Sequence, residues 1–417
     1  MKTKAASLHR TAAQWIEAHQ LLQNCCILLV CLVYILPNVW AIRTMYYVIV
    51  LPLLLLTITP PEIARIGRSP IFLSAAIYFL VFVIASPFTM EVDNGAVVGH
   101  IRNAVLVLSY IAMLAILASR DPAFAVRLFT YVGVTAAIAA AANIWVFYGG
   151  LPPLDRLPPR LEGIPGQTMY YNSNYVALGY AIPCVGAVAA ITAGTRRPIA
   201  VLLGAAALVL LAAVVLTQTR NTLIGLATGM AVLIVLLPHR FGLATKLSIW
   251  TLAISAAALV LLLLGNSFLS RGDSYRLFLW DAYLGYLAAH PWAGSGLTTP
   301  LPVILPDGTE ILQPHNMIYH AALRGGVFAG LALATLFGAV LVAGTRQSWR
   351  TGSPVLLALA VASIVPLQMD FPFLAGSFGL DWVTLWLPIG LVLGASLPNV
   401  PKVSDSVPGA VTTGAGF

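Results

Sequence analysis

The chain has 417 residues, of which 59% are hydrophobic and 9% are charged, and its mean hydropathy is +0.91. These values lie far above those of a soluble domain and indicate a polytopic membrane protein. A formal net charge of +8 would suggest nucleic acid as the partner of a soluble protein. In a membrane protein it reflects charge bias between loops and contact with lipid headgroups, so membrane lipids and no nucleic acid are expected as partners.

Apolar runs long enough to cross a bilayer recur along the chain and predict an all-α polytopic membrane protein of about twelve transmembrane helices. Four cysteines without metal-ligand spacing fall in or beside these runs, and we interpret them as small buried hydrophobic side chains. Residues 1–398 are predicted to form a single transmembrane domain and residues 399–417 a disordered tail. The predicted spans cover approximately 20–37, 45–60, 71–88, 98–118, 124–147, 172–193, 199–217, 221–238, 247–265, 316–344, 355–370 and 378–396.

The predicted bundle is strongly polarised in charge. An amphipathic stretch with Trp15 and Ile16 precedes a first apolar run too long for a signal peptide, so no cleavable signal is expected. With twelve spans both termini lie on one side, which carries 14 of the 22 basic residues and 4 of the 14 acidic ones, giving +10 there and −2 opposite. Because basic loops stay in the cytoplasm, both termini are predicted to be cytoplasmic. The arginines left on the outer side are Arg43, Arg102, Arg156, Arg160, Arg220, Arg271, Arg276 and Arg324.

Two outer segments are long, and long loops without a domain of their own are usually functional. The first, about 149–171, is rich in Pro and Gly and carries Arg156 and Arg160, which could hold phosphates. The second, about 266–315 between the predicted ninth and tenth helices, is expected to contain short helices. The inner loops are short and show no Walker or Rossmann pattern, so no nucleotide-binding domain is expected.

Residues from Asp273 to about Ala288 are predicted to form a short amphipathic helix on the outer interface, because polar and aromatic residues recur on one face. Arg276 lies on that face, where Asp273 could steer its guanidinium and Trp280 could flank it. The functional interpretation is that Arg276 binds phosphate. The alternative is an interfacial anchor whose charge reaches lipid headgroups.

Arg220 lies between two long apolar runs that are separated by about one turn. An ionisable group at such a depth is costly and by default indicates a functional site. Its planar, permanently charged fork of donors suits a pyrophosphate better than lysine would. The alternative is a structural arginine paired with an acid from a distant helix, such as Asp370 or Asp381.

His315 stands at the start of another apolar helix, and an imidazole can accept a proton near neutral pH and then hold it. We therefore predict a general base, with capping or packing at the interface as the alternative. Asn316 and Tyr319 are expected on the same helix face. The Gly326-x-x-x-Gly330 spacing predicts a close helix contact that would hold the imidazole rigidly.

Other ionisable residues on the outer side carry weaker signals. His100 and Arg102 lie at the outer end of another predicted helix. They are interpreted either as side chains that reach lipid headgroups or as substrate-binding residues. Glu91 and Asp93 mimic the acidic metal motif of some membrane glycosyltransferases, but two acids in a turn are usually solvated, so no metal is predicted. A further pair, expected to face the bundle and assigned no role, is His320 and Arg324.

At these residues the chain resembles the O-antigen ligase/polymerase superfamily of bacterial inner-membrane proteins. The resemblance is strong over about 200–345, whereas the first half matches only in hydropathy and length. The ligase branch ends its histidine motif with Gly, Thr or Tyr where this chain has Ala329, with Gly330 one residue later. The motifs that carry the resemblance are Thr219-Arg220-Asn221, Arg276-x-x-x-Trp280, His290-Pro291-x-x-Gly294-x-Gly296, and His315-Asn316 followed after nine residues by Gly326.

The resemblance implies a GT-C-like bundle of about twelve helices in the bacterial inner membrane, with an undecaprenyl-diphosphate-linked O-antigen as donor and a sugar of the lipid A-core as acceptor. It also implies essential roles for Arg220, Arg276 and His315. Together with the residue chemistry it predicts a metal-independent, cofactor-free, inverting glycosyl transfer at the periplasmic face. The two arginines would neutralise the leaving diphosphate while His315 deprotonates the acceptor. The other residues expected to contact substrate are Arg156, Arg160, Asn316, Trp280, Arg102 and Tyr319.

Two other functions remain open at this stage. An O-antigen polymerase would share the chemistry and differ in its acceptor. A non-enzymatic lipid or glycan transporter would predict inverted repeats with Gly- or Pro-broken helices at matching positions of the two halves, and the sequence contains no such pairing.

Overall fold

The computed structural model describes residues 20–36, 38–89, 93–149, 159–163, 172–236, 275–370, 376 and 378–398. The protein is mostly helical, and seven of the described helices are long and apolar enough to cross a membrane by length and composition. The predicted class, an all-α polytopic membrane protein, is confirmed at that level. The seven helices are α3–η1–α4 (Val39–Thr57), α6–η2 (Pro70–Phe88), α7 (Asn94–Arg120), α8 (Phe124–Tyr148), α9 (Ser173–Thr192), α10 (Arg197–Leu216) and α14 (Met317–Thr351).

Shorter apolar helices occupy four of the remaining predicted spans, so eleven of the twelve predicted ranges coincide with a described helix. The predicted span 247–265 lies outside the described residues, as do the N-terminal amphipathic stretch, most of the segment 149–171 and the tail 399–417. The short apolar helices are α2 (Leu21–Ile35), α11 (Arg220–Val235), α15 (Val355–Leu367) and η3–α16 (Trp382–Ser396), and a further short helix, α5 (Pro60–Gly67), joins α4 to α6.

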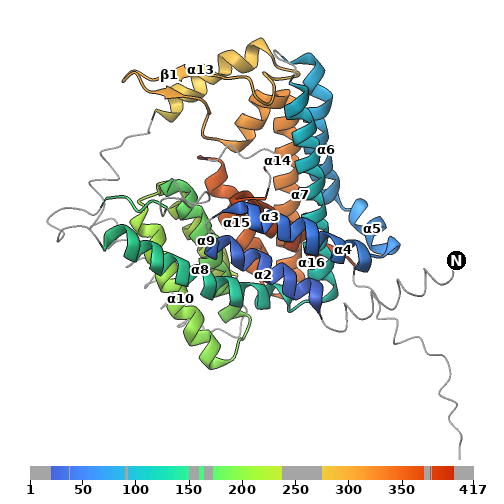
Figure 1. Ribbon diagram of the computed structural model, residues 1–417, viewed down its shortest axis with the longest axis vertical. Coiled ribbons are helices and arrows are strands. Elements are labelled where there is room, and N and C mark those ends of the chain that lie inside the picture. The colour runs from blue at the N-terminus through green and yellow to red at the C-terminus, as the bar shows by residue number, and fades with distance from the viewer. Residues whose placement is uncertain are drawn as a thin grey trace, which may run out of the picture.

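The helices form two groups that meet at α15. Helices α6, α7, α14 and α16 pack together in one group, α8, α9 and α10 in the other, and α15 contacts α9, α11, α14 and α16 (Figure 1). Small residues permit the closest approach: a Cβ on Gly225 would lie 2.2 Å from Pro366, and one on Gly229 would lie 2.6 Å from the Cβ of Ala362. Close packing through small residues is the usual way in which helices associate in membranes. It brings the first turn of α11 beside the last turn of α15.

Helix α14 is broken near its start, which corrects the prediction of a continuous helix with a Gly326-x-x-x-Gly330 contact face. Gly325 and Gly326 leave the helical conformation, and Gly326 has a φ of 76°. A Cβ on Gly330 would lie 2.9 Å from the Cβ of Ala322, although residues eight positions apart in a straight helix are separated by about 12 Å. The first turns of α14 therefore fold back against the part that follows the break. A continuous apolar run hides such a break, because hydropathy reports burial and not backbone direction.

The segment 290–296 fills the break in α14. Three backbone hydrogen bonds join this segment to α14. They run from Val327 N to Pro291 O (2.8 Å), from Ser295 N to Leu323 O (2.8 Å) and from Gly296 N to Arg324 O (3.1 Å). Broken helices are tolerated at membrane depth only where the freed backbone groups find other partners. The His-Pro-x-x-Gly-x-Gly motif provides those partners, so its role in the fold is to brace α14.

A small second core lies at one end of the molecule and is called the cap, residues 276–311 (Figure 1). Helix α13 (Arg276–Ala289) confirms the predicted short helix. A turn at Asp307 connects two strands that the sequence did not indicate, β1 (Val303–Ile304) and β2 (Glu310–Ile311). The Tyr283 hydroxyl donates to one of two carbonyls, Leu301 O at 3.1 Å or Ile311 O at 3.0 Å, which ties α13 to the hairpin. The core consists of Leu279, Tyr283, Leu301, Val303, Leu305 and Leu323.

Candidate functional site

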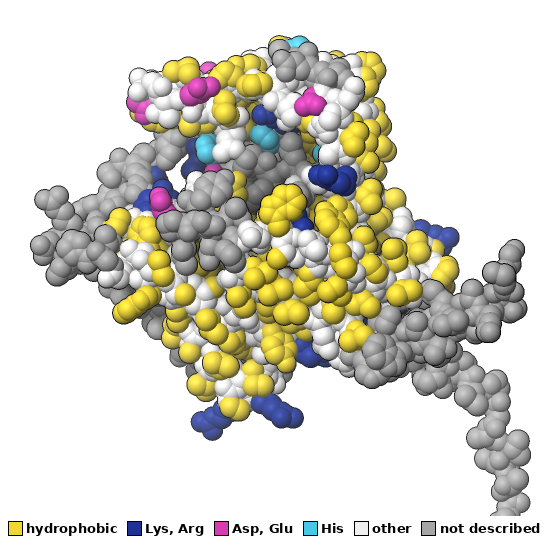
Figure 2. Space-filling model, viewed as in Figure 1, with side chains coloured by type: hydrophobic (Ala, Val, Ile, Leu, Met, Phe, Trp, Pro, Cys, Tyr) yellow, Lys and Arg dark blue, Asp and Glu magenta, His cyan; other side chains and the backbone are white. Residues whose placement is uncertain are grey.

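A cavity of about 180 Å³ lies between the cap and the helical body. Figure 2 shows the molecular surface hollowed beneath α13 and the hairpin, with basic and histidine side chains visible in the hollow. The structure therefore brings Arg220, Arg276 and His315 to one cavity. The lining residues are Arg160, Asn174, Gln218, Thr219, Arg220, Asn221, Arg276, His315 and Asp370.

Four helices begin at this cavity. Arg220 is the first residue of α11 and Arg276 the first residue of α13, while Asn174 is the second residue of α9 and His315 directly precedes Asn316, the N-cap of α14. The N-terminus of a helix carries a partial positive charge and unpaired N–H groups that favour anions. Among the described residues that line the cavity, three arginines against one aspartate add to this field, which suits a ligand with more than one negative charge.

The backbone is held in an uncommon conformation at three of these helix starts. Gln218, Tyr275 and His315 have φ values of 53°, 58° and 52°, and in the described part of the chain Gln20 is the other non-glycine residue with a positive φ. A left-handed conformation costs a residue with a side chain about 1–2 kcal/mol. Such conformations persist where the surroundings impose them, and they concentrate at functional sites.

His315 is hydrogen-bonded to a buried carboxylate. Its Nδ1 lies 2.8 Å from Oδ1 of Asp370, and the other carboxylate oxygen accepts a hydrogen bond from Nδ2 of Asn174. Asp370 is 5% exposed, so these contacts supply partners that water does not. With a proton on Nδ1 shared with Asp370, the second ring nitrogen is left as the acceptor, which is the tautomer that a general base needs.

Asp370 and Asp381, the acids considered as structural partners of Arg220, have different surroundings. Asp370 lines the same cavity as Arg220, but its two oxygens bind His315 and Asn174. Asp381 is buried at the start of η3 (Trp382–Trp386) and does not line this cavity. The described lining of the cavity therefore contains Arg220 together with Asp370, whose carboxylate hydrogen-bonds the imidazole of His315.

Two asparagines hydrogen-bond the starts of α11 and α14 to the residues that follow α15. Asn221, which follows Arg220, donates its amide to Met369 O at 3.1 Å, and Asn316, which follows His315, donates to Gln368 O at 2.9 Å. Asn316 also caps α14, because its Oδ1 accepts from Tyr319 N at 2.9 Å. Both ends of the Asn316 amide are thus used within the protein, next to Asp370.

Arg160 enters the cavity from the segment 159–163. Its Nε donates to Thr217 O at 3.0 Å, and one terminal nitrogen contacts Asn174 Oδ1 at 3.1 Å and Thr219 Oγ1 at 3.3 Å. These contacts hold the guanidinium beside the start of α11. Arg156, the other arginine predicted in this segment, lies outside the described residues.

Trp280 and Tyr319 connect the cap to the histidine segment. The indole N–H of Trp280 donates to Pro314 O at 2.8 Å, and the Tyr319 hydroxyl donates to Trp280 O at 2.9 Å. Neither residue lines the cavity, and Arg102, which is exposed on α7, does not line it either. Of the predicted substrate-binding residues, Arg160 is the one that the structure places in the cavity wall.

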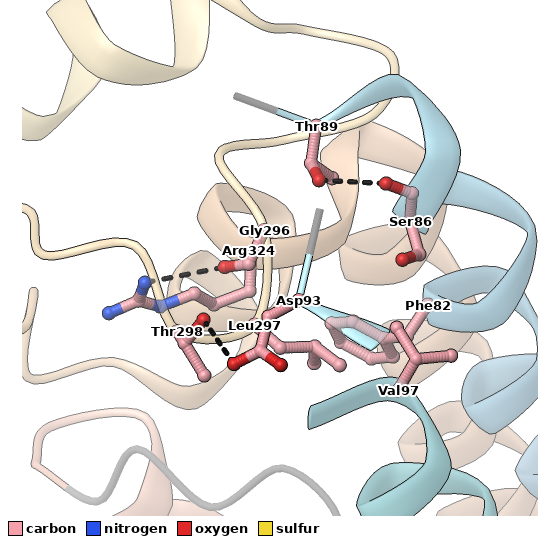
Figure 3. A pocket seen from close by; sticks show the side chains of 9 residues that line it. All are labelled: Phe82, Ser86, Thr89, Asp93, Val97, Gly296, Leu297, Thr298 and Arg324. Carbon is pink, nitrogen blue, oxygen red and sulfur yellow. Dashed lines mark hydrogen bonds between the residues drawn. The ribbon is translucent and has the colours of Figure 1, made fainter. Parts of the chain in front are cut away.

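Arg324, which was assigned no role, lines a second, much smaller cavity, shown in Figure 3. Its volume is about 10 Å³, room for about one water molecule. Arg324 donates to the carbonyls of Gly296 and Thr299 and so holds the loop that braces α14, with His320 buried one turn away on the same helix. Asp93 caps α7 through Ala96 N at 2.9 Å. Glu91 lies outside the described residues.

Several residues of the site carried no clear sequence signal. Asn174 and Gln218 are ordinary polar residues at helix starts, where asparagine usually indicates a cap, and Asn221 was noted only as part of the Thr219-Arg220-Asn221 motif. Only the packing of α9, α11 and α15 shows that they meet around Asp370.

Comparisons with known proteins agree with the sequence motifs. The family described as O-Antigen ligase matches residues 205–334, a range that contains Arg220, Arg276 and His315. A protein of Pseudomonas aeruginosa described as "O-antigen ligase" is 26% identical over 362 residues, which cover 84% of each chain. Both comparisons support the resemblance of this chain to the O-antigen ligase/polymerase superfamily.

Proposed function

We propose that this protein is an O-antigen ligase, a GT-C-like glycosyltransferase that moves a glycan from undecaprenyl diphosphate onto the lipid A-core at the periplasmic face of the bacterial inner membrane. The observation that carries the proposal is that Arg220, Arg276 and His315, from three different helix starts, line one cavity. The P. aeruginosa relative described as O-antigen ligase supports the same reaction class.

The diphosphate of the donor would occupy the cationic part of the cavity. Arg220 and Arg276 bind its oxygens, and the helix starts add fixed partial charges where the leaving group gains negative charge. Arg160 lies in the same wall and extends the site for a further phosphate of donor or acceptor. Because these charges are already in place, little reorganisation is needed when the sugar–phosphate bond breaks.

His315 would act as the base in a single displacement. The acceptor hydroxyl gives its proton to the ring nitrogen of His315 that does not bind Asp370, and its oxygen forms the new bond to the anomeric carbon. The bond from that carbon to the diphosphate breaks, and its electron pair leaves on undecaprenyl diphosphate. Attack opposite the leaving group inverts the anomeric centre, and His315 then releases its proton to solvent.

The charge distribution supports a periplasmic site and cytoplasmic termini. Asp93, at the start of α7, contacts Thr298 of the cap loop, whereas Arg120 is the last residue of the same 27-residue helix. A helix of that length spans about 40 Å, so Arg120 lies near the opposite membrane face from the cavity. With Arg127 and the other basic inner loops, this orientation satisfies the positive-inside rule for a single domain of about twelve spans.

The test is a reconstituted transfer. Purified protein in detergent should join a defined undecaprenyl-diphosphate-linked glycan to lipid A-core without any other protein. Extension of one lipid-linked glycan by another, with no product on lipid A-core, would indicate an O-antigen polymerase. Movement of lipid between leaflets of a vesicle without a covalent product would indicate a transporter.

The departure at Ala329 has little bearing on the choice between ligase and polymerase. Ala329 is fully buried and lies 2.8 Å from a Cβ placed on Gly325, so it packs inside the break of α14. It does not line the cavity. The residue at position 329 therefore affects how the two parts of α14 pack at the break, and it does not contact the acceptor directly.

A further inference from the structure

Asn174 connects the cationic wall of the cavity to the base. Its Oδ1 accepts from Arg160 at 3.1 Å and from Thr219 Oγ1 at 3.2 Å, and its Nδ2 donates to Oδ2 of Asp370. The other oxygen of Asp370 binds His315. An unbroken series of hydrogen bonds therefore runs from Arg160 through Asn174 and Asp370 to His315.

The chemistry of the two neighbours suits an amide at this position. A guanidinium only donates and a carboxylate only accepts, so the residue between them must accept on one side and donate on the other. A carboxylate would still bind Arg160 but would repel Asp370, and an alanine would lose both contacts. Asp370 is 5% exposed, so the partner that it loses in such a variant is not readily replaced by bulk water.

We propose that Asn174 is a positioning residue that holds Arg160 for the donor and the Asp370–His315 pair for turnover, with each end of its amide serving one of these two tasks. This inference rests on the proposed function, because it takes His315 as the base and the arginines as the diphosphate site. The inference predicts that loss of the oxygen end affects donor binding and that loss of the nitrogen end affects turnover. A general structural role for Asn174 would not separate these two effects.

The decisive variant is Asn174→Asp, which keeps an oxygen toward Arg160 and removes the donor to Asp370. The expected result is a KM for the lipid-linked donor within about twofold of wild type and a kcat reduced at least about tenfold. In the described part of the cavity wall, the charged and titratable groups are Arg160, Arg220, Arg276, Asp370 and His315. An added negative charge beside Asp370 favours the protonated imidazole, so the acidic limb of kcat/KM should move to higher pH by on the order of one unit.

Asn174→Ala should raise the donor KM and lower kcat together, because both contacts are lost. In a double-mutant cycle its effect on kcat should disappear in the Asp370→Asn background, and its effect on KM should disappear in the Arg160→Gln background. Asn143→Ala is the matched control, since Asn143 is a buried asparagine of α8 that does not line the cavity; its effects should add to both backgrounds. Melting temperatures in detergent report whether each variant folds, and Asn174→Ser is the second variant if the alanine does not.

Wild-type kcat and pH profile in folded Asn174→Asp, or simple additivity of Asn174→Ala with Asp370→Asn, would overturn the inference. The proposed function fails in a different way. If His315→Ala keeps full turnover, the base assignment is wrong whatever the Asn174 variants do. If His315→Ala is inactive while the Asn174 variants behave as wild type, only the positioning role is lost.

Discussion

The imidazole of His315 and the carboxylate of Asp370 are joined at 2.8 Å, although 55 positions separate them in the chain. Asp370→Asn keeps the shape of the side chain and removes the charge that fixes the tautomer and stabilises the imidazolium. We expect kcat for glycan transfer to fall by roughly 10²–10⁴-fold, with a smaller change in the donor KM. Steady-state kinetics with purified protein measures both, and an unchanged kcat would show that the carboxylate does not assist the base.

His315→Ala should lose turnover while donor binding is retained, because the cationic wall of the cavity is unaltered. Equilibrium binding of a lipid-linked glycan, measured beside the transfer rate, separates the two effects. Equal losses of binding and turnover would instead assign His315 to the binding of the donor.

Arg220→Lys and Arg276→Lys should each impair transfer strongly, although the charge is kept. A lysine has one ammonium group in place of a planar fork, so it cannot bind two diphosphate oxygens side by side. We expect at least about a tenfold loss in kcat/KM for each lysine variant and abolition of transfer for each alanine variant. Membrane insertion and melting temperature provide the controls, and normal activity of a folded alanine variant contradicts the diphosphate role.

Transfer should continue in excess chelator, because fixed arginines and helix starts already supply the positive charge that a divalent ion would otherwise bring to the diphosphate. The measurement is the initial rate after incubation with a chelator, with and without added Mg²⁺ or Mn²⁺. A rate abolished by the chelator and restored by one of these ions would favour Glu91 and Asp93 as a metal site.

Gly326→Ala should destabilise the protein without touching the cavity. Gly326 has a φ of 76°, and a Cβ there would lie 2.0 Å from Trp292 O. The expected cost is on the order of 1–3 kcal/mol, seen as a lower melting temperature in detergent. Gly338→Ala on the same helix is the control, because nothing lies within 4 Å of its Cβ position, and it should be neutral or slightly stabilising. Similar melting temperatures for the two variants would mean that the brace at residues 290–296 adapts.

Glu62 and Arg120 form an ion pair at 2.7 Å that ties α5 to the end of α7. Burial alone would raise the pKa of Glu62, but hydrogen bonds from Arg120 and Thr59 outweigh it and hold this pKa below its ordinary value. A carboxyl group with a lowered pKa in the folded state stabilises the protein above its unfolded pKa, and this contribution is lost as pH falls through the folded value.

Glu62→Gln should therefore lower the stability at pH 7 by on the order of 1–3 kcal/mol, and the difference from wild type should shrink in acid below about pH 4. Thermal melts of both proteins across this pH range provide the measurement. Glu310→Gln, in the exposed strand β2, is the control with little expected effect. A difference that stays constant from pH 7 into acid would rule out ionisation of Glu62 as its cause.

Much of the fold was predictable because membrane insertion depends on a local property. A run of about 20 apolar residues is needed to cross the hydrocarbon layer, so hydropathy along the chain located α6, α7, α8, α9 and α10 within a few residues. The break at Gly326 was missed because the run stays apolar through it. The strands β1 and β2 were missed because two-residue strands have too few positions to show alternation.

The site was predictable only in part. Arg220, Arg276 and His315, which line the candidate site, were singled out because an ionisable group beside an apolar run is costly to insert and therefore informative. Asp370 was considered only as a partner of Arg220, and Asn174 gave no signal because an asparagine at a helix start is ordinary. Their contacts depend on which helices are neighbours, and no local pattern carries that information.

The sequence by itself determined that the protein spans a membrane, which ends of its helices are rich in positive charge, and which three ionisable residues are out of place. Each of these follows from the transfer free energy of side chains, a sum over residues that does not depend on how the helices pack. The tertiary structure alone decided that the last turn of α15 meets the starts of α9, α11 and α14, with Asp370 between Asn174 and His315. Hydrogen bonds act over about 3 Å, so they exist only after close packing through Gly225 and Gly229 has brought these helices together.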